Sequence, residues 1–414
     1  MSLLNGITIS IGDELLSGKT FDSNNAFIST VFSRVGIKIS KKLIIGDVNE
    51  NIKKALNWSL AEADVVTITG GLGPTHDDIT KQALCEFFGV ELKTHPEILE
   101  SLKTRFSKRG FEFPKSNASQ AEYPANAEIL HNSVGTAQGM YFVHDGSHLF
   151  VMPGVPAEMR AITNEQIIPR LRDMTGAIQE SIDIHSIGMP ESQLYEVTKP
   201  VLDEYKGAKV AYLPKHFVVT IRVSYDSEEV GENAEKLAEI YARLSQQLPE
   251  NIYGRNDESL SSVVGAELLK RQATVATAES CTGGLIASMI TDISGSSDYF
   301  NTGFVTYANE TKMAVLGVQE ETLMHGAVSE ETVAEMLSGT LERSGSDYAI
   351  AVSGVAGPTG GTEEKPVGTV YIGVAGNTRQ YIKRFQFGSH RVLNKQLSAF
   401  TALNLLRLLI RDEL

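Results

Sequence analysis

The residues with the clearest chemical potential lie in the segment Thr277-Ala-Glu-Ser-Cys-Thr-Gly-Gly284. The run before it, 273–277, is rich in β-branched residues, and the run after it, 285–290, continues as an apolar helix. Ser280 is therefore expected at or near a helix N-terminus, where unpaired backbone N–H groups and the helix dipole stabilise a developing anion. A serine that attacks an acyl carbon needs this position. The alternative is that Ser280 only caps the helix.

A nucleophilic serine also needs a base, and Lys312 is the strongest candidate. It ends a β-rich run that begins at Gly303 and contains Tyr307. No Gly-x-Ser-x-Gly elbow followed by Asp and His is present, so the residues favour a Ser–Lys amidase with Tyr307 as a third, hydroxyl-bearing participant. Lysine acts as a base only when burial or a nearby cation brings its pKa well below about 10.4. Taken singly, Lys312 would be a surface lysine and Tyr307 an ordinary strand aromatic.

A third segment combines a strand with a glycine-rich loop. The apolar run 348–352 predicts a strand, and 353–361 follows it with glycines and hydroxyl groups. Backbone N–H groups of such a loop can bind a nucleotide phosphate, and ligands of open α/β sheets lie at the carboxyl ends of strands. Arg391 begins the last helix, where the positive end of the helix dipole disfavours a cation. It is therefore a candidate for a second phosphate contact. A mobile surface loop and an exposed arginine are the alternatives.

Residues 258–409 resemble the nicotinamide mononucleotide amidohydrolase family in three motifs: 278–284, 307–312 and 353–361. The resemblance implies hydrolysis of nicotinamide mononucleotide to nicotinate mononucleotide and ammonia. Ser280 would be the nucleophile, Lys312 the base and Tyr307 a proton relay, with backbone N–H groups of 281–283 holding the oxyanion. This domain is expected to need no cofactor. The implied substrate-binding residues are Cys281, Thr282, Gly283, Gly284, Asn309, Ser353, Gly354, Gly357, Thr359, Gly360, Gly361 and Arg391.

Length and composition limit the remaining possibilities. A chain of 414 residues predicts roughly two to three domains. Its formal charge of -14 argues against nonspecific attraction to DNA or anionic membranes, so neither is expected as a partner. Cys85 and Cys281 are too far apart in sequence for a metal motif or a disulfide framework, which fits a reducing cytoplasm. Asp13 and Glu14 interrupt the first apolar run, so no signal peptide is expected.

The amino-terminal part alternates strand-like and helix-like runs, which predicts an α/β domain with a parallel sheet. The expected strands are 6–11, 41–45 and 64–69, and the expected helices are 24–34 and 51–63. A glycine-rich loop, 70–80, follows the third strand. Asp77 and Asp78 in this loop either cap the next helix or hold a divalent metal ion against a pyrophosphate. The candidate ligand-binding residues here are Gly70, Gly71, Gly73, Thr75, Asp77 and Asp78.

Residues 1 to 170 resemble the molybdopterin-binding domain family. In 12–18, 22–24, 46–47, 70–80 and 152–156 they resemble more closely the amino-terminal half of the CinA family of competence/damage-inducible proteins. The resemblance implies a metal-dependent ADP-ribose pyrophosphatase, whose metal ion the sequence does not identify. Pterin binding without hydrolysis is the alternative, because the same loop serves it elsewhere in the superfamily.

A smaller α+β module is expected between these segments, with strands at 182–187, 209–213 and 217–223 and helices at 191–205 and 229–247. It resembles the KH-like insert of the CinA family but lacks a Gly-x-x-Gly loop, so we expect spacing or homodimer formation rather than RNA binding. The predicted domains are 1–172, 173–252 and 256–414, and 249–257 reads as a linker. Two alternatives stay open: a pterin- or nucleotide-binding regulatory protein without chemistry, or an ADP-ribose pyrophosphatase with a silent amidase domain.

Overall fold

The computed structural model describes residues 4–75, 77–108, 110–176, 178–215, 217–227, 231–376 and 378–414. Contacts divide the chain into two compact units. The first is Met1–Glu180 with Tyr225–Ala234, and the second is Ser181–Ser224 with Glu235–Leu414. Within the described residues, no helix is both long enough and apolar enough to span a membrane.

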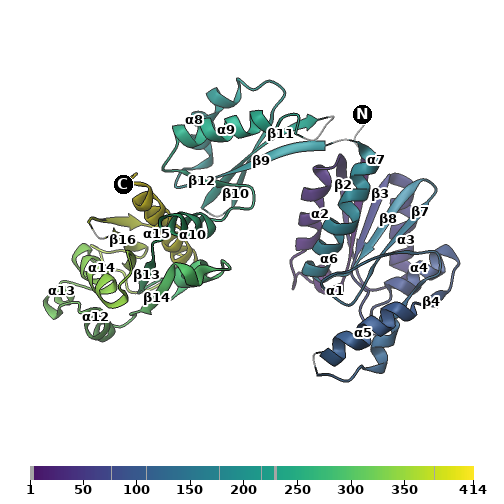
Figure 1. Ribbon diagram of the computed structural model, residues 1–414, viewed down its shortest axis with the longest axis horizontal. Coiled ribbons are helices and arrows are strands. Elements are labelled where there is room, and N and C mark those ends of the chain that lie inside the picture. Colours follow the sequence, from purple (N-terminus) through teal and green to yellow (C-terminus); the bar gives the residue numbers. More distant parts are fainter. Residues whose placement is uncertain are drawn as a thin grey trace. The chain divides into compact units, whose positions relative to one another are not determined.

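The first unit contains a six-stranded sheet in the order β2-β1-β3-β8-β7-β6. Helices α2, α6 and α7 cover one face, and α3 and α4 cover the other, so two apolar cores enclose the sheet (Figure 1). The strands of this sheet are β1 (Leu4–Ile11), β2 (Ile37–Ile45), β3 (Val65–Thr69), β6 (Glu128–Leu130), β7 (Gly139–His144) and β8 (Ser147–Met152). A separate two-stranded sheet is formed by β4 (Leu92–Thr94) and β5 (Glu122–Pro124). The helices are α1 (Asp13–Leu16), α2 (Ser23–Ser33), α3 (Asn49–Glu62), α4 (Thr80–Phe88), α5 (Pro96–Lys108), α6 (Pro156–Ile162) and α7 (Ile168–Thr175).

The predicted parallel sheet is confirmed for β2, β1, β3 and β8, which pair in parallel. The far edge differs, because β7 is antiparallel to both β8 and β6. Only Asp145 and Gly146 separate β7 from β8, and their φ angles are 48° and 87°. A two-residue loop with positive φ at both positions makes a hairpin and is far too short for a parallel crossover.

The second unit begins with the KH-like module, a sheet in the order β10-β11-β9-β12 with two helices. Its described elements are β9 (Ile178–Ile187), α8 (Glu191–Leu202), β10 (Lys209–Lys215), β11 (Val218–Ser227), α9 (Ala234–Gln247) and β12 (Ile252–Arg255). The predicted strands are confirmed here, and so are the two helices, although the second begins at Ala234 and its expected start at Glu229 lies outside the described residues. The predicted linker 249–257 is partly wrong, because it contains β12, which pairs with β9.

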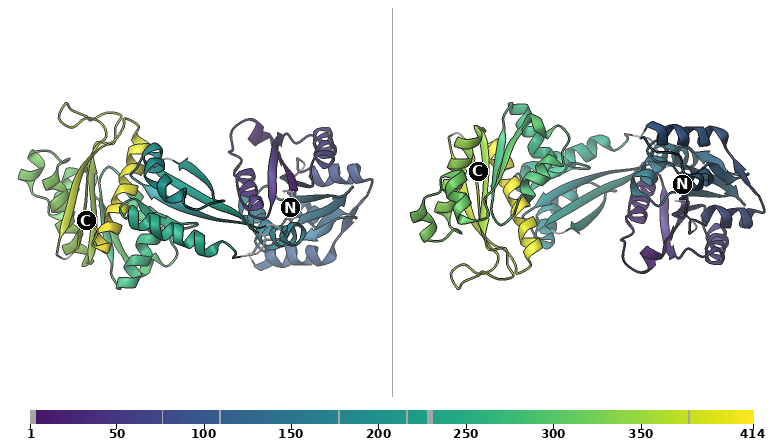
Figure 2. Two further views of the ribbon diagram at one scale, coloured as in Figure 1. Left: turned by 90° about the horizontal axis from the view of Figure 1, so that it is seen from above. Right: turned by 90° about the horizontal axis from the view of Figure 1, so that it is seen from below.

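The C-terminal domain has a five-stranded sheet in the order β14-β13-β15-β16-β17. Helices α10, α11 and α15 pack on one face and α12 and α14 on the other, and both views of Figure 2 show α15 running along the sheet. The strands are β13 (Val275–Glu279), β14 (Phe300–Val305), β15 (Tyr348–Gly354), β16 (Thr369–Gly376) and β17 (Gln380–Gln386). The helices are α10 (Leu260–Arg271), α11 (Leu285–Thr291), α12 (Asn309–Leu316), α13 (Glu320–Met324), α14 (Glu330–Ser344) and α15 (Arg391–Arg411).

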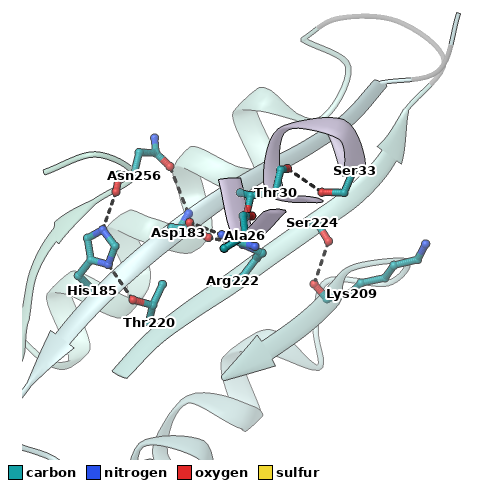
Figure 3. Close-up of polar contacts among 10 residues, drawn as sticks. All are labelled: Ala26, Thr30, Ser33, Asp183, His185, Lys209, Thr220, Arg222, Ser224 and Asn256. Atoms are coloured by element: carbon teal, nitrogen blue, oxygen red, sulfur yellow. Dashed lines mark hydrogen bonds and ion pairs between the residues drawn. The ribbon is translucent and has the colours of Figure 1, made fainter. Parts of the chain in front are cut away.

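The expected linker around Asn256 is bonded to the KH-like sheet. Asn256 N donates to Asp183 O (2.7 Å), Asp183 N donates to Asn256 Oδ1 (3.2 Å), and His185 Nε2 donates to the carbonyl oxygen of Asn256 (2.7 Å), as Figure 3 shows in part. Arg222 fixes the Asp183 carboxylate through bonds of 2.6 and 2.7 Å. These hydrogen bonds attach the residue that leads into the C-terminal domain to strand β9 of the KH-like module. The connection within the second unit is therefore hydrogen-bonded and not a free linker.

Candidate functional site

Ser280 lies in the turn after β13, the strand between β14 and β15. These three strands are parallel, so the turn emerges at their shared carboxyl edge, where open α/β sheets bind ligands. Ser280 N donates to Val352 O (3.0 Å), and Gly283 N donates to Ser280 O (3.1 Å). Gly283 and Gly284 have φ angles of 63° and 91°, which side chains rarely adopt, so the glycines let the chain close this tight turn before α11.

Glu279, and not Ser280, caps helix α11. Its carboxylate accepts hydrogen bonds from the N–H groups of Gly284 (3.0 Å), Ile286 (3.1 Å) and Ala287 (2.8 Å), and the residue is completely buried. The alternative that Ser280 serves only as a helix cap is therefore wrong. Its hydroxyl faces a different partner.

That partner is Lys312, on the first turns of α12. Lys312 Nζ lies 3.1 Å from Ser280 Oγ, 2.9 Å from Thr306 O and 3.2 Å from Tyr307 O. The lysine is 1% exposed, so the alternative of a surface lysine is wrong. Burial lowers the pKa of its ammonium group, because a low-dielectric surrounding disfavours the charged form. The lysine nitrogen thus lies within hydrogen-bonding distance of the Ser280 hydroxyl, as a base for this serine requires.

Cys281 is the other nucleophile in the turn. It is buried, and burial raises the pKa of its thiol to about 12. A thiol with that pKa stays protonated near neutral pH, and the thiolate is the reactive form. Ser280 is the residue that meets the lysine, so the geometry favours the serine as nucleophile.

The side chain of Tyr307 lies apart from this pair. Its hydroxyl accepts a hydrogen bond from Arg391 (2.9 Å), whose other terminal nitrogen donates to Gly357 O (2.7 Å). The phenol is 59% exposed. Tyr307 therefore contributes its backbone carbonyl to Lys312 and its hydroxyl to Arg391, and a proton relay through that hydroxyl stays a prediction.

The glycine-rich loop is only partly turned toward a ligand. Ser353 is buried and its hydroxyl donates to Ala327 O (2.6 Å), so this hydroxyl makes a hydrogen bond inside the protein and does not face a ligand. Gly354 packs against Thr369 and Val370 with no room for a side chain. Gly357 is buried and its carbonyl orients Arg391. The exposed residues of the predicted binding set are Gly283, Asn309, Thr359, Gly360, Gly361 and Arg391.

Among the described residues of the turn, the N–H groups that donate to no carbonyl or carboxylate are those of Cys281 and Thr282, so these are the candidates for holding an oxyanion. The N–H groups of Ser280, Gly283 and Gly284 already bond to Val352 O, Ser280 O and the Glu279 carboxylate. Thr282 is fully buried, and its hydroxyl has no partner in the described residues. The sequence analysis assigned no role to Glu279. Its position directly before the turn and close to the start of the next helix was the signal that could have indicated a helix cap.

The predicted amino-terminal ligand site is a cavity of about 410 Å³. Gly70 and Gly71 have φ angles of 109° and 66°, and Asp78 accepts hydrogen bonds from Thr75 N (2.9 Å) and Thr75 Oγ1 (2.5 Å). Helix α4 begins at Thr80, so Asp78 shapes the loop through Thr75 rather than capping the helix. His76 in this loop lies outside the described residues. The lining residues include Glu14, Asp47, Gly70, Gly71, Gly73, Asp77, Asp78 and Glu158.

The pKa of Asp47, one of the carboxylates of this cavity, is raised. Burial, and then the negative charges of Asp13, Glu14 and Asp77, raise the pKa of Asp47. Carboxylate oxygens are the ligands that hard divalent cations prefer, so the donor set fits such an ion. Across the described stretches of the chain, however, no three His, Cys, Asp or Glu side chains converge in a preformed metal site.

Comparison with known proteins covers all three segments. Residues 7–173 match the family described as Probable molybdopterin binding domain, 182–254 match the Damage-inducible protein CinA KH domain, and 257–410 match the CinA C-terminal domain. A CinA-like protein of Chloroherpeton thalassium is 42% identical, covering 97% of this chain and 98% of its own length. One of Syntrophomonas wolfei is 41% identical, covering 96% and 97%.

Among solved structures, the competence/damage inducible protein CihA from Agrobacterium tumefaciens has 40% identity, covering 37% of this chain and 93% of its own, with a TM-score of 0.36. The family matches and the two full-length relatives confirm, at the level of the family, the resemblance seen in the sequence motifs. With matches in every segment and relatives aligned along nearly the whole length, this chain belongs to the CinA family.

Proposed function

We propose that the C-terminal domain hydrolyses the carboxamide of nicotinamide mononucleotide to nicotinate mononucleotide and ammonia. The observation that carries the proposal is the 3.1 Å contact between Ser280 Oγ and a buried lysine nitrogen. An activated serine beside a base of lowered pKa supports acyl transfer, in which an amide carbon is attacked and an amine departs.

The surroundings of Lys312 support its role as the base. A neutral amine has two N–H donors and one lone pair. The carbonyl oxygens of Thr306 and Tyr307 can accept both donors, at 2.9 and 3.2 Å, and the lone pair is then left for the Ser280 hydroxyl proton. The two carbonyls thus orient the base, and burial lowers its pKa, which favours the neutral form.

The reaction follows from this arrangement. Lys312 takes the Ser280 proton as Oγ attacks the amide carbon, and the N–H groups of Cys281 and Thr282 stabilise the oxyanion. The protonated lysine returns the proton to the departing nitrogen, which leaves as ammonia and an acyl-serine remains. Water then gives a proton to Lys312 and attacks the acyl carbon. Ser280 leaves as the alkoxide and recovers the proton, which regenerates the site with nicotinate mononucleotide released.

Product analysis tests the proposal. The purified protein is incubated with nicotinamide mononucleotide, and ammonia and nicotinate mononucleotide are measured together. Ser280→Ala should abolish both products, and the matched change Cys281→Ala should retain much of the activity. An active Ser280→Ala variant, or inactivation only by Cys281→Ala, contradicts the assignment. An inactive wild-type protein favours the alternative of a binding protein without chemistry.

A second proposed function, metal-dependent hydrolysis of ADP-ribose, is supported by the carboxylate-rich cavity of the first unit. Asp47, Asp77 and Asp78 would hold a divalent cation, which would neutralise the charge of a bound pyrophosphate. The chain's own residues shape the glycine loop and fix Asp78 through Thr75. Formation of AMP and ribose 5-phosphate from ADP-ribose, with and without a chelator, tests it. Binding of ADP-ribose without any product supports a non-hydrolytic site.

A further inference from the structure

Lys395 lies one turn after Arg391 on helix α15, and it was absent from the residues predicted from the sequence. A Cβ atom on Gly283 would stand 3.7 Å from Lys395 Nζ. The ammonium group therefore lies directly over the turn that carries Ser280. Residues one helical turn apart share a face, so Arg391 and Lys395 point to the same side of α15. Helix α15 packs against α11, the helix that directly follows the Ser280 turn.

Within the described residues, neither cation forms an ion pair with a carboxylate. Within the part of the chain that the structure describes, the ammonium of Lys395 has no hydrogen-bond or ion-pair partner. The recorded acceptors of Arg391 are the uncharged oxygens of Gly357 and Tyr307. The chain as a whole has a charge of -14, so two cations that form no ion pair in the described residues, beside a candidate active site, differ from the acidic character of the chain. Such a pair favours an anionic ligand.

We propose that Lys395, together with Arg391, binds the phosphate group of the substrate. This inference rests on the proposed amidase function and makes it specific for 5′-phosphorylated nucleosides. The glycine-rich loop then has a supporting task, because its Gly357 carbonyl orients the guanidinium group. Arg391 offers a fork of donors and Lys395 a compact charge, which together suit a tetrahedral anion.

Phosphate binding tests the inference without any need for activity. Cys85 and Cys281 are the only cysteines, so full-length protein labelled with 15N-cysteine has one amide signal at the site and one in the other unit. Inorganic phosphate should shift the Cys281 signal in a saturable way. Lys395→Gln should weaken that titration about tenfold to a hundredfold, or about 1.4 to 2.8 kcal/mol at 1.4 kcal/mol per tenfold. Lys270→Gln removes the same charge from an exposed position on α10 and should change nothing.

Kinetics supply the second readout. Lys395→Gln should lower kcat/KM for nicotinamide mononucleotide by a similar factor, mainly through KM, and leave the rate on nicotinamide riboside unchanged. Lys395→Arg should recover part of the loss. An unaltered phosphate titration in Lys395→Gln, or equal losses on both substrates, overturns the inference. If the wild-type protein releases no ammonia and the Cys281 shift still depends on Lys395, the proposed amidase function fails and the anion site stands.

Discussion

Replacement of Lys312 by arginine separates a base from a fixed positive charge. The guanidinium group keeps the charge, but it does not deprotonate in proteins and cannot accept the Ser280 proton. General-base catalysis contributes about 100- to 10,000-fold. At 1.36 kcal/mol per tenfold, the change should therefore cost about 2.7 to 5.4 kcal/mol of transition-state stabilisation. We expect kcat to fall by that factor.

The assay is steady-state ammonia release between pH 6 and about 10, with nicotinamide mononucleotide binding measured separately. In the wild-type protein kcat/KM should rise with pH as Lys312 loses its proton, because burial lowers the pKa of its ammonium group from its ordinary value of 10.5. The rise should be missing from the residual activity of Lys312→Arg. If Lys312→Arg turns over within tenfold of the wild-type rate with an unchanged pH profile, Lys312 is not the base. Its role is then limited to supplying a positive charge.

Arginine is larger than lysine and the site is buried, so Lys312→Met is the matched variant for folding. Its loss of activity should equal that of Lys312→Arg. Its stability should also show the cost of the buried ammonium group. Between the folded pKa of Lys312 and 10.5 the unfolded wild-type chain binds more protons than the folded chain, so the free energy of unfolding rises with pH in that window. Lys312→Met should lack that rise in a denaturant series.

Three further outcomes follow from the two sites. Glu279→Gln removes the negative charge that accepts hydrogen bonds from three N–H groups, and it places an amide NH2 opposite one of those donors. The free energy of unfolding of the C-terminal domain, measured by denaturant titration, should therefore fall by about 2 to 4 kcal/mol. Tyr307→Phe keeps the backbone carbonyl that orients Lys312, so kcat should fall less than about tenfold; a loss as large as that of Lys312→Arg supports the proton relay instead. A chelator should stop ADP-ribose hydrolysis and spare ammonia release, and Asp77→Asn with Asp78→Asn should reproduce it. Equal inhibition of both reactions contradicts the independence of the sites.

The sequence predicted the strand–turn–helix around Ser280 well, because β-branched residues, two glycines and an apolar helix follow one another within a short stretch. The loop hydroxyl of Ser353 was misjudged, because its acceptor, Ala327, comes from a distant segment that the motif does not contain. The contact between Ser280 and Lys312 was inferred from motif types, but the burial that lowers the lysine pKa depends on how the sheet and helices pack. Lys395 was missed for the same reason, since only the packing of α15 brings it over Gly283.

The edge of the first sheet shows a different kind of failure. Asp145-Gly146 is a strong local signal for a hairpin, yet the alternation of helices and strands before it favoured a parallel sheet throughout. The local signal determined the result, because two residues cannot carry a crossover. The KH-like module was recognised from its pattern, but its attachment to the next domain depends on side chains that are far apart in sequence.

That attachment leads to the last prediction, which concerns a fragment beginning at Asn256. All residues of the proposed amidase site follow this position, so the fragment should retain ammonia release per folded molecule. It should be less stable than a fragment beginning at Ser181. Arg407 is completely buried and donates to Pro249 O (3.0 Å) and Glu250 O (2.9 Å).

Ile187 and Tyr253 of the KH-like module also belong to the apolar core that contains Leu406 of α15. Truncation removes these side chains and the two carbonyl acceptors of Arg407, and we expect a loss of about 3 kcal/mol, or a Tm lower by roughly 6 to 12 °C. Calorimetry of the two fragments measures the difference, with ammonia release as the control for the site. Equal Tm values would show that the module adds nothing to the core. A folded but inactive Asn256 fragment would show that the site needs residues from the KH-like module, because that module is all that separates the two fragments.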